Sequence, residues 1–386
     1  MHITPLLALI PATLAALLIK VKRDEVIAGK YIVKLLGDVS TLAEDELKKS
    51  VSSAPDFEYS LPGFRGFAAT LSDHEVAQLQ TSSQVEYVEQ DAKVYVSALV
   101  EQDNAPWGLG RISHHEKGNT TYVYDNTAGE GTCSYIIDTG IYTEHPEFEG
   151  RATFLTDVSG EGTLADGYGH GTHVAGTIGS AGYGVAKKTK LFAVKVLDSN
   201  GSGSASTIIA GINFVQNDAR DRKASGECPK GVVSNMSLGG YKSTSMNEAS
   251  AALVASGVFL AVSAGNSGDD AKNYSPASEP TVCTVGATTI DDKFIDWSNH
   301  GTLVDILAPG VNITSTWLNG ETEILSGTSM ASPHVAGLGA YLLGLGSAGV
   351  DTLCDTIKEL ATKDKIDPMR LPNGTVNALA FNGVEE

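Results

Sequence analysis

The pattern of apolar and polar positions divides the chain into three parts, and the first is an apolar run from Leu6 to Ile19 that Pro11 interrupts. This run is shorter than the roughly 20 residues that span a bilayer. It therefore predicts a secretory signal peptide over residues 1–19, with an end between 15 and 20. No Lys or Arg precedes the run, so a hydrophobic N-terminal helix of the fold is the alternative.

The second part, residues 20–97, alternates short strand-like and helix-like patterns. Strands are predicted at 30–35, 64–71, 85–91 and 93–96. Helices are predicted at 41–51 and after Ser72, where Glu75 stands at capping-box spacing. This order predicts a small α+β module. Because it contains no cysteine and no catalytic cluster, we expect a folding or inhibitory segment.

A polar stretch near residues 97–104 marks the boundary of the third part, residues 98–386. Near-continuous apolar strands are predicted at 133–138, 191–197, 231–238, 258–264 and 282–287. Helices are predicted at 172–178, 204–218 and 245–256. Apolar strands separated by helices indicate an α/β fold with a parallel sheet covered on both faces. In such folds the ligand site lies beyond the carboxyl ends of the strands.

Composition narrows the class of protein. With 42% hydrophobic and 19% charged residues, the chain is globular. Its formal charge is −19, of which −15 belongs to residues 98–386, and this disfavours nucleic acid and anionic membrane surfaces as partners. The four cysteines form no CxxC pair that would suggest zinc. Their even number in a chain with a predicted secretory start indicates two disulfides, for which three pairings are possible.

The first candidate for chemistry is Ser329, within the segment 325–337. The glycine before Ser329 predicts a turn that places Ser329 in the first turn of a helix. Pro333 is typical of the opening of such a helix. A backbone N–H and the positive end of the helix dipole would then lie beside the serine, where they could hold an oxyanion. The alternative interpretation is an ordinary helix N-cap.

Three further candidates stand at predicted strand ends or helix starts. Asp138 closes the first strand of the large part, and the absence of a second Asp-Thr-Gly or Asp-Ser-Gly argues against an aspartic protease. His170 enters a helix, and its spacing to His173 lacks the Glu of a zinc protease motif. Asn266 follows the fourth strand, as a turn residue or an amide donor. Together, Asp, His, Asn and Ser indicate acyl transfer.

Three motifs carry a family resemblance. The segments 138–140, 170–176 and 327–331 resemble the signature boxes of the subtilisin family, and 105–109, 274–280 and 374–377 resemble its proteinase K group of secreted fungal proteases. The resemblance covers residues 98–383, and residues 30–97 resemble the family's I9-type inhibitory propeptide.

The resemblance implies a three-layer α/β/α subtilisin-like fold with a mainly parallel sheet, after a ferredoxin-like α+β propeptide. It also implies a secreted, extracellular serine endopeptidase made as a zymogen, which cleaves itself near residues 97–99. Its partners would be protein or peptide substrates and its own propeptide, with no nucleic acid or membrane, and it would be a monomer. A catalytically inactive binding protein is the alternative, but none of the four chemical residues is missing.

The roles of individual residues follow from the same resemblance. Ser329 would be the nucleophile, His170 the general base and acid, and Asp138 the residue that orients His170. Asn266 and the Ser329 N–H would bind the oxyanion. The residues expected to bind substrate are Ser237, Leu238, Gly239, Ser202, Gly203, Ala264 and Gly265. Their lack of charge predicts a preference for apolar or aromatic residues before the cut.

The resemblance further implies the disulfides Cys133–Cys228 and Cys283–Cys354. It implies one structural calcium ion, held by the carbonyl oxygens of Pro280 and Val282 and by the carboxylate of Asp305, all hard oxygen ligands.

Some positions depart from the family pattern. Val174 stands where proteinase K has a thiol, so thiol sensitivity is not expected. Lys365 makes a second calcium site near Asp364 and Asp367 doubtful. Ala205 replaces a tyrosine and predicts a wider distal pocket. The candidate glycosylation sites are Asn119, Asn273, Asn312 and Asn373, whereas Asn235 is excluded because it falls in a predicted buried strand.

Overall fold

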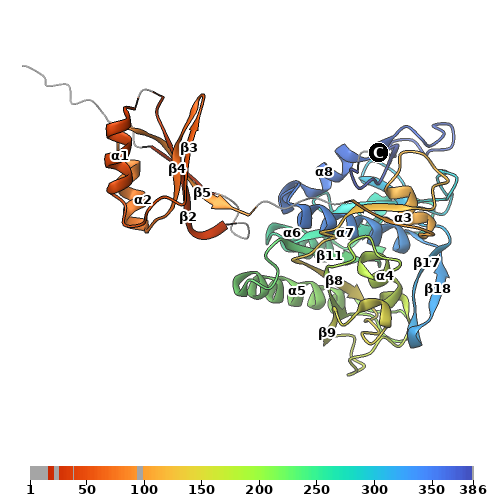
Figure 1. Ribbon diagram of the computed structural model, residues 1–386. Coiled ribbons are helices and arrows are strands. Elements are labelled where there is room, and N and C mark those ends of the chain that lie inside the picture. Colours follow the sequence, from red (N-terminus) through yellow and green to blue (C-terminus); the bar gives the residue numbers. More distant parts are fainter. Residues whose placement is uncertain (1–15, 21–25, 38, 94–98, 385–386) are drawn as a thin grey trace, which may run out of the picture. The chain divides into compact units, whose positions relative to one another are not determined.

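The computed structural model describes residues 16–20, 26–37, 39–93 and 99–384. These residues form two compact units that divide between positions 96 and 97 (Figure 1). Each unit has its own hydrophobic core, centred in the first on side chains such as Val33, Phe67 and Val88.

Unit 1 is a five-stranded sheet with two helices, ordered β1-β5-β2-β4-β3. Its elements are β1 (Leu17–Ile19), β2 (Val26–Leu35), α1 (Thr41–Lys49), β3 (Phe57–Leu61), β4 (Phe64–Thr70), α2 (Asp73–Gln80) and β5 (Val85–Ala92). The predicted α+β module is confirmed, including the capping box, in which Ser72 and Glu75 bind each other's backbone N–H. The sequence did not predict β3, and the strand expected at 93–96 lies almost wholly outside the described residues.

The short strand β1 lies within the run that was predicted as a signal peptide. It pairs in parallel with β5, with Leu17 opposite Tyr87. The residue before it, Ala16, is buried and donates its N–H to the carbonyl of Gln80 at 2.7 Å. A leader that ended at Ile19 would therefore remove a strand of unit 1.

Unit 2 is built around a nine-stranded sheet, ordered β19-β20-β16-β15-β13-β11-β8-β10-β9. Its strands are β8 (Thr132–Asp138), β9 (Ala152–Asp157), β10 (Lys190–Lys195), β11 (Gly231–Met236), β13 (Phe259–Ser263), β15 (Cys283–Thr288), β16 (Ile306–Pro309), β19 (Thr362–Lys363) and β20 (Ala378–Leu379). All neighbours are parallel except β19 and β20. All five strands predicted for this part occur in the sheet.

Three two-stranded ribbons and several short 3₁₀ turns surround this sheet. The ribbons pair β6 (Leu99–Gln102) with β7 (Tyr122–Asp125), β12 (Gly240–Tyr241) with β14 (Tyr274–Ser275), and β17 (Ile313–Thr316) with β18 (Thr322–Leu325). The 3₁₀ turns are Pro146–Phe148, Ala271–Asn273, Leu318–Gly320 and Val350–Thr352.

Helices cover both faces of the sheet (Figure 1). On one face lie α3 (Trp107–Ile112), α4 (His170–Gly179), α7 (Thr328–Leu345) and α8 (Leu353–Leu360), and on the other lie α5 (Ala205–Ser225) and α6 (Thr244–Ala255). Successive residues of β8 alternate between the two cores, with Ile136 in one and Tyr135 and Ile137 in the other. The predicted three-layer α/β/α fold is confirmed.

One local prediction was wrong. Pro333 is the sixth residue of α7, so it lies beyond the opening turn. A proline there has no N–H for the carbonyl four residues earlier, which belongs to Ser329. The hydroxyl of Ser237 donates to that carbonyl at 2.7 Å and replaces the missing helix hydrogen bond.

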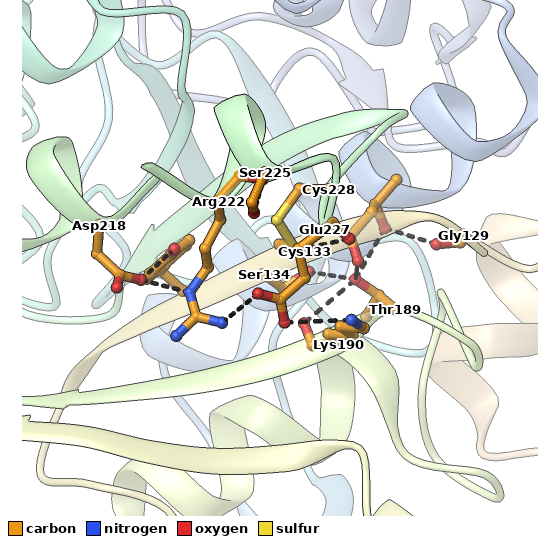
Figure 2. Close-up of a disulfide and its surroundings, with 12 residues drawn as sticks. Gly129, Cys133, Ser134, Thr189, Lys190, Asp218, Arg222, Ser225, Glu227 and Cys228 are labelled. Carbon is orange, nitrogen blue, oxygen red and sulfur yellow. Dashed lines mark hydrogen bonds and ion pairs between the residues drawn. A yellow bond between two sulfur atoms is a disulfide. The ribbon is translucent and has the colours of Figure 1, made fainter. Parts of the chain in front are cut away.

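The four cysteines form the two disulfides that the resemblance implied, Cys133–Cys228 and Cys283–Cys354. Figure 2 shows the first, which joins β8 to the segment after α5 beside a group of charged side chains. There Arg222 pairs with Asp218 at 2.6 Å and with Glu227 at 2.7 Å. The disulfide closes a sequence separation of 95 residues, for which chain-entropy arguments predict a stabilisation of about 4–5 kcal/mol.

Within the described part of the chain, the helices are all too short or too polar to cross a membrane.

Candidate active site

One polar contact at the carboxyl end of the sheet joins Asp138 to His170. Asp138 is the last residue of β8 and is fully buried, and His170 is the first residue of α4. Asp138 Oδ1 accepts hydrogen bonds from His170 Nδ1 at 2.8 Å and from the N–H of Thr139 at 2.7 Å. A carboxylate at Nδ1 holds the ring proton there and leaves Nε2 free to accept a proton.

The charge on His170 depends on two carboxylates. Burial by itself lowers the pKa of this ring, whose side chain is 18% exposed, but the charge and hydrogen bond of Asp138 and the charge of Asp166 raise the pKa above its usual value. Asp166 also accepts the N–H groups of Gly169 at 2.8 Å and Thr172 at 3.0 Å, at the start of α4. The site therefore stabilises an imidazolium.

The candidate nucleophile, Ser329, is the second residue of α7 and is partly exposed. Its hydroxyl donates to the carbonyl oxygen of Ser237 at 3.2 Å. In the described structure no hydrogen bond joins Ser329 to His170. Hydrogen bonds between a nucleophile and its base often form only when substrate is bound, so rotation of the Ser329 side chain is required before proton transfer.

The side-chain amide of Asn266 is oriented by Thr328. The backbone N–H and the hydroxyl of Thr328 lie 2.8 Å and 2.9 Å from Asn266 Oδ1. Because a backbone N–H can only donate, this contact identifies the oxygen of the amide and leaves Nδ2 as a donor toward the cleft.

A second donor lies beside this amide. A Cβ atom built on Gly327 would lie 3.5 Å from the backbone nitrogen of Ser329 and 3.6 Å from Asn266 Nδ2. The absent side chain of Gly327 therefore leaves space between two N–H donors at the start of a helix. Such a pair can stabilise a developing oxyanion.

Two cavities flank these residues. One, of about 300 Å³, includes Ser329 and Asn266 in its lining, and the other, of about 430 Å³, includes His170. The first is also lined by Leu238, Gly239, Gly240, Tyr241, Ser263, Ala264, Gly265, Ser267, Tyr274, Ser275 and Ala277. The second is also lined by Thr139, Tyr168, Leu197, Gly201, Ser202, Gly203, Ile208, Ser237, Leu238 and Gly239.

All seven residues expected to bind substrate line one or both cavities. Leu238 and Gly239 are shared, so the segment after β11 separates the cavities. The 300 Å³ cavity has no charged side chain in its lining, and Tyr241, which is 86% exposed, stacks on Tyr274 at its edge. Ala205 lies exposed at the first residue of α5.

Of the residues expected to hold calcium, Pro280 and Val282 lie just before β15, and Asp305 lies just before its neighbour β16. Asp305 Oδ2 accepts the N–H of Thr284 at 2.9 Å, and Asp305 Oδ1 faces Lys358 Nζ at 3.5 Å. Asp305 is 24% exposed and its second oxygen has only this distant cation, so the carboxylate fits a hard divalent ion. Its cysteine neighbours Cys283 and Cys354 are joined in a disulfide and offer no thiolate.

Lys365 and the candidate glycosylation residues are on the surface. Lys365 pairs with Glu116 at 2.5 Å, near the place where a second calcium site was doubtful. The four candidate glycosylation residues, Asn119, Asn273, Asn312 and Asn373, are all exposed. Asn235, which the sequence excluded, is fully buried in β11.

Sequence reasoning missed the residues that support the site. Thr328 lies within the serine motif, but its contact with Asn266 spans 62 positions of sequence. Asp166 stands four residues before His170, and an acidic residue just ahead of a predicted helix was the available signal. Glu161 and Lys195, which lie beside the larger cavity, gave no local signal.

Known proteins resemble the chain over both units. The Subtilase family model matches residues 129–370, and the Peptidase inhibitor I9 model matches residues 30–97. A cuticle-degrading protease of Metarhizium anisopliae is 52% identical over 99% of this chain and all of that protein. Proteinase T of Parengyodontium album is 59% identical over 77% of this chain and 99% of that protein.

A solved structure also matches. The crystal structure of a cold adapted subtilisin-like serine proteinase is 40% identical to this chain, with a TM-score of 0.67. The match covers 73% of this chain and 100% of the other.

Proposed function

The chain belongs to the subtilase family of serine proteases, and we propose that it cuts peptide bonds with Ser329 as nucleophile, His170 as general base and Asp138 as the residue that orients His170. The observation that carries this proposal is the partly buried hydrogen bond of 2.8 Å between His170 Nδ1 and Asp138, which leaves Nε2 free to accept the serine proton.

The proposed reaction has two halves. Ser329 Oγ attacks the carbonyl carbon of the substrate and gives its proton to His170 Nε2. The negative charge that develops on the carbonyl oxygen is held by the N–H of Ser329 and by Asn266 Nδ2. His170 then donates its proton to the leaving amine, and the acyl group remains on Ser329. Water, deprotonated by His170 Nε2, then attacks the acyl carbon. The bond to Ser329 Oγ breaks, the acid leaves, and His170 returns the proton to Oγ.

The cavities suggest the substrate preference. We assign the 300 Å³ cavity, which contains Ser329, to the residue before the cut. Its lining has no charged side chain, so we expect apolar or aromatic residues to be preferred there. Cleavage of a peptide library dominated by Lys or Arg at this position would contradict the assignment.

We further propose that residues up to about 97 are a leader and an inhibitory propeptide of a secreted, monomeric zymogen. The pairing of β1 with β5 supports a leader that ends at Ala15 or Ala16, within the predicted range and before Leu17. Self-cleavage near residues 97–99 would then release the protease. N-terminal sequencing and intact mass of the precursor and the mature protein test both positions, and a glycan mass would identify which of the exposed sequons are used.

Subtilases generally bind calcium, and we propose that Pro280, Val282 and Asp305 hold one structural ion in this chain. The ion would compensate the charge of Asp305 and tie the start of β15 to the loop before β16.

The catalytic proposal is tested with Ser329→Ala in the full-length precursor. We expect the variant to remain unprocessed and to leave casein intact, because it lacks the hydroxyl that we propose attacks the peptide bond. A variant that still matured by itself and hydrolysed casein would overturn the assignment.

A further inference from the structure

Lys195 is a fully buried lysine at the end of β10, opposite Asp138 in the register of β10 and β8. Its Nζ donates to the carbonyl oxygens of Thr139 at 3.0 Å and Leu197 at 2.5 Å. It also pairs with Glu161 Oε2 at 3.0 Å. A buried ammonium group is costly unless it is compensated by charge and hydrogen bonds. Glu161 supplies the compensating charge in direct contact.

Glu161 connects this lysine to a second loop. It lies between β9 and α4, and its two carboxylate oxygens accept hydrogen bonds from Ser199, one from the N–H at 2.9 Å and one from the hydroxyl at 3.0 Å. The carboxylate therefore bridges a fully buried cation and the exposed turn that follows β10.

This turn forms one wall of the 430 Å³ cavity. Gly201, Ser202 and Gly203 line the cavity, together with Ser237, Leu238 and Gly239 from the segment after β11. Within the turn, Asp198 Oδ1 accepts the N–H groups of Asn200 and Ser202, each at 2.9 Å. These local bonds shape the turn, whereas the bonds from Ser199 to Glu161 attach it to the neighbouring loop.

We propose that Glu161, anchored on Lys195, is a positioning residue that holds the wall 201–203 ready to bind the substrate backbone on the side before the cut. This rests on the proposed function, because it describes how the same cleft binds extended substrates. A peptide that binds as an added strand gains affinity from main-chain hydrogen bonds to such a wall. A loose wall must be ordered at the moment of binding, which lowers affinity.

The test compares a long and a short substrate in the mature enzyme with Glu161→Gln. The long substrate is a tetrapeptide anilide, which reaches the wall, and the short one is N-acetyl-tyrosine ethyl ester, which does not. We expect KM for the tetrapeptide to rise about tenfold with kcat within twofold, and both constants for the ester to stay within twofold. An equal loss of kcat/KM for the two substrates, or no change in kcat/KM for either, would overturn the proposal.

Two further variants separate positioning from general stability. Ser199→Ala removes only the hydroxyl donor and leaves Lys195 paired, so we expect a smaller rise in the tetrapeptide KM, of about two- to threefold. Glu227→Gln is the matched control, because Glu227 also pairs with a lysine, Lys190, and with a second group, Arg222, but neither partner lines a cavity or belongs to the turn after β10. We expect it to leave both substrates unchanged. A wild-type enzyme that hydrolysed neither substrate would instead refute the proposed function.

Discussion

Ser237 and Ser329 exchange two hydrogen bonds: Ser237 Oγ donates to the Ser329 carbonyl at 2.7 Å, and Ser329 Oγ donates to the Ser237 carbonyl at 3.2 Å. The first bond exists because Pro333 cannot supply an N–H to the same carbonyl. The backbone that carries the proposed nucleophile is thus tied to the segment that separates the two cavities. A residue expected only to bind substrate also supports the serine.

Replacing Ser237 with Ala should therefore affect stability as well as activity. The variant leaves the carbonyl of Ser329 without its donor, and an unsatisfied buried polar group costs about 1–3 kcal/mol. We expect a lower thermal midpoint and a lower kcat in the mature enzyme, measured by calorimetry and peptide hydrolysis. Ser225→Ala, which removes an exposed hydroxyl bound to the carbonyl of Arg222, should change neither. An unchanged midpoint for Ser237→Ala would contradict the supporting role.

Gly327→Ala tests the space between the two oxyanion donors. The new methyl group would lie 3.5 Å and 3.6 Å from the two nitrogen atoms, so it meets no clash but occupies the space that the substrate oxygen needs. We expect kcat to fall by roughly 100-fold or more, with the thermal midpoint nearly unchanged. Gly349→Ala is the control, because a Cβ atom there would meet only Thr352 Oγ1, at 3.9 Å. Full activity of Gly327→Ala would argue against this oxyanion site.

The dependence of the rate on pH reports the charges around His170. Neutral His170 is the active base, so kcat/KM should fall as the pH drops through the pKa of His170. Burial lowers this pKa, and the carboxylates of Asp138 and Asp166 raise it above its usual value. Removing one negative charge with Asp166→Asn should therefore lower the pKa of His170. The fall in kcat/KM on the acidic side of the pH profile should then move to lower pH. If kcat/KM of the variant fell at the same pH as in the wild type, or at a higher pH, Asp166 would not act through its charge.

Calcium should stabilise the mature enzyme through Asp305, with Lys358 as a competitor. A ligand at 100 times its Kd stabilises the folded state by about 2.7 kcal/mol, so we expect the thermal midpoint to rise with added calcium and to fall with a chelator. Asp305→Asn, which keeps an oxygen for Thr284, should abolish the rise. Lys358→Met removes the cation 3.5 Å from Asp305 and should strengthen calcium binding.

The matched control for calcium is Lys293→Met, which removes an exposed lysine paired with Asp291. It should leave the calcium response of the wild type unchanged. Calorimetric titration with calcium measures the affinity of each variant directly. A response that survived Asp305→Asn would place the ion elsewhere.

Local pattern was enough to predict much of the fold. The strands of the large unit are near-continuous apolar runs, and Asp138 and His170 stand where a run ends or a helix begins, so their proximity follows from a parallel sheet. The run at residues 17–19 was harder, because an apolar segment fits either a leader or a strand. Its pairing with β5 depends on residues about 70 positions away.

The contacts that refine the site could not be predicted from local pattern. Thr328 orients Asn266 across 62 positions, and Ser237 reaches Ser329 across 92 positions. Prolines favour the opening turn of a helix, so the sequence predicts Pro333 there. The hydroxyl of Ser237, from another segment, replaces the missing hydrogen bond and allows Pro333 to lie deeper in α7. Glu161 and Lys195 are ordinary charged residues in the sequence, and only the fold brings their side chains together.

The most direct test of Ser329 is the mass of the mature enzyme after reaction with a fluorophosphonate, which modifies an activated serine. We predict one adduct in the wild type, located on Ser329 by peptide mapping, and none in Ser329→Ala refolded with its propeptide supplied separately. An adduct on a different residue, or an unmodified wild type that still hydrolyses peptides, would contradict the account.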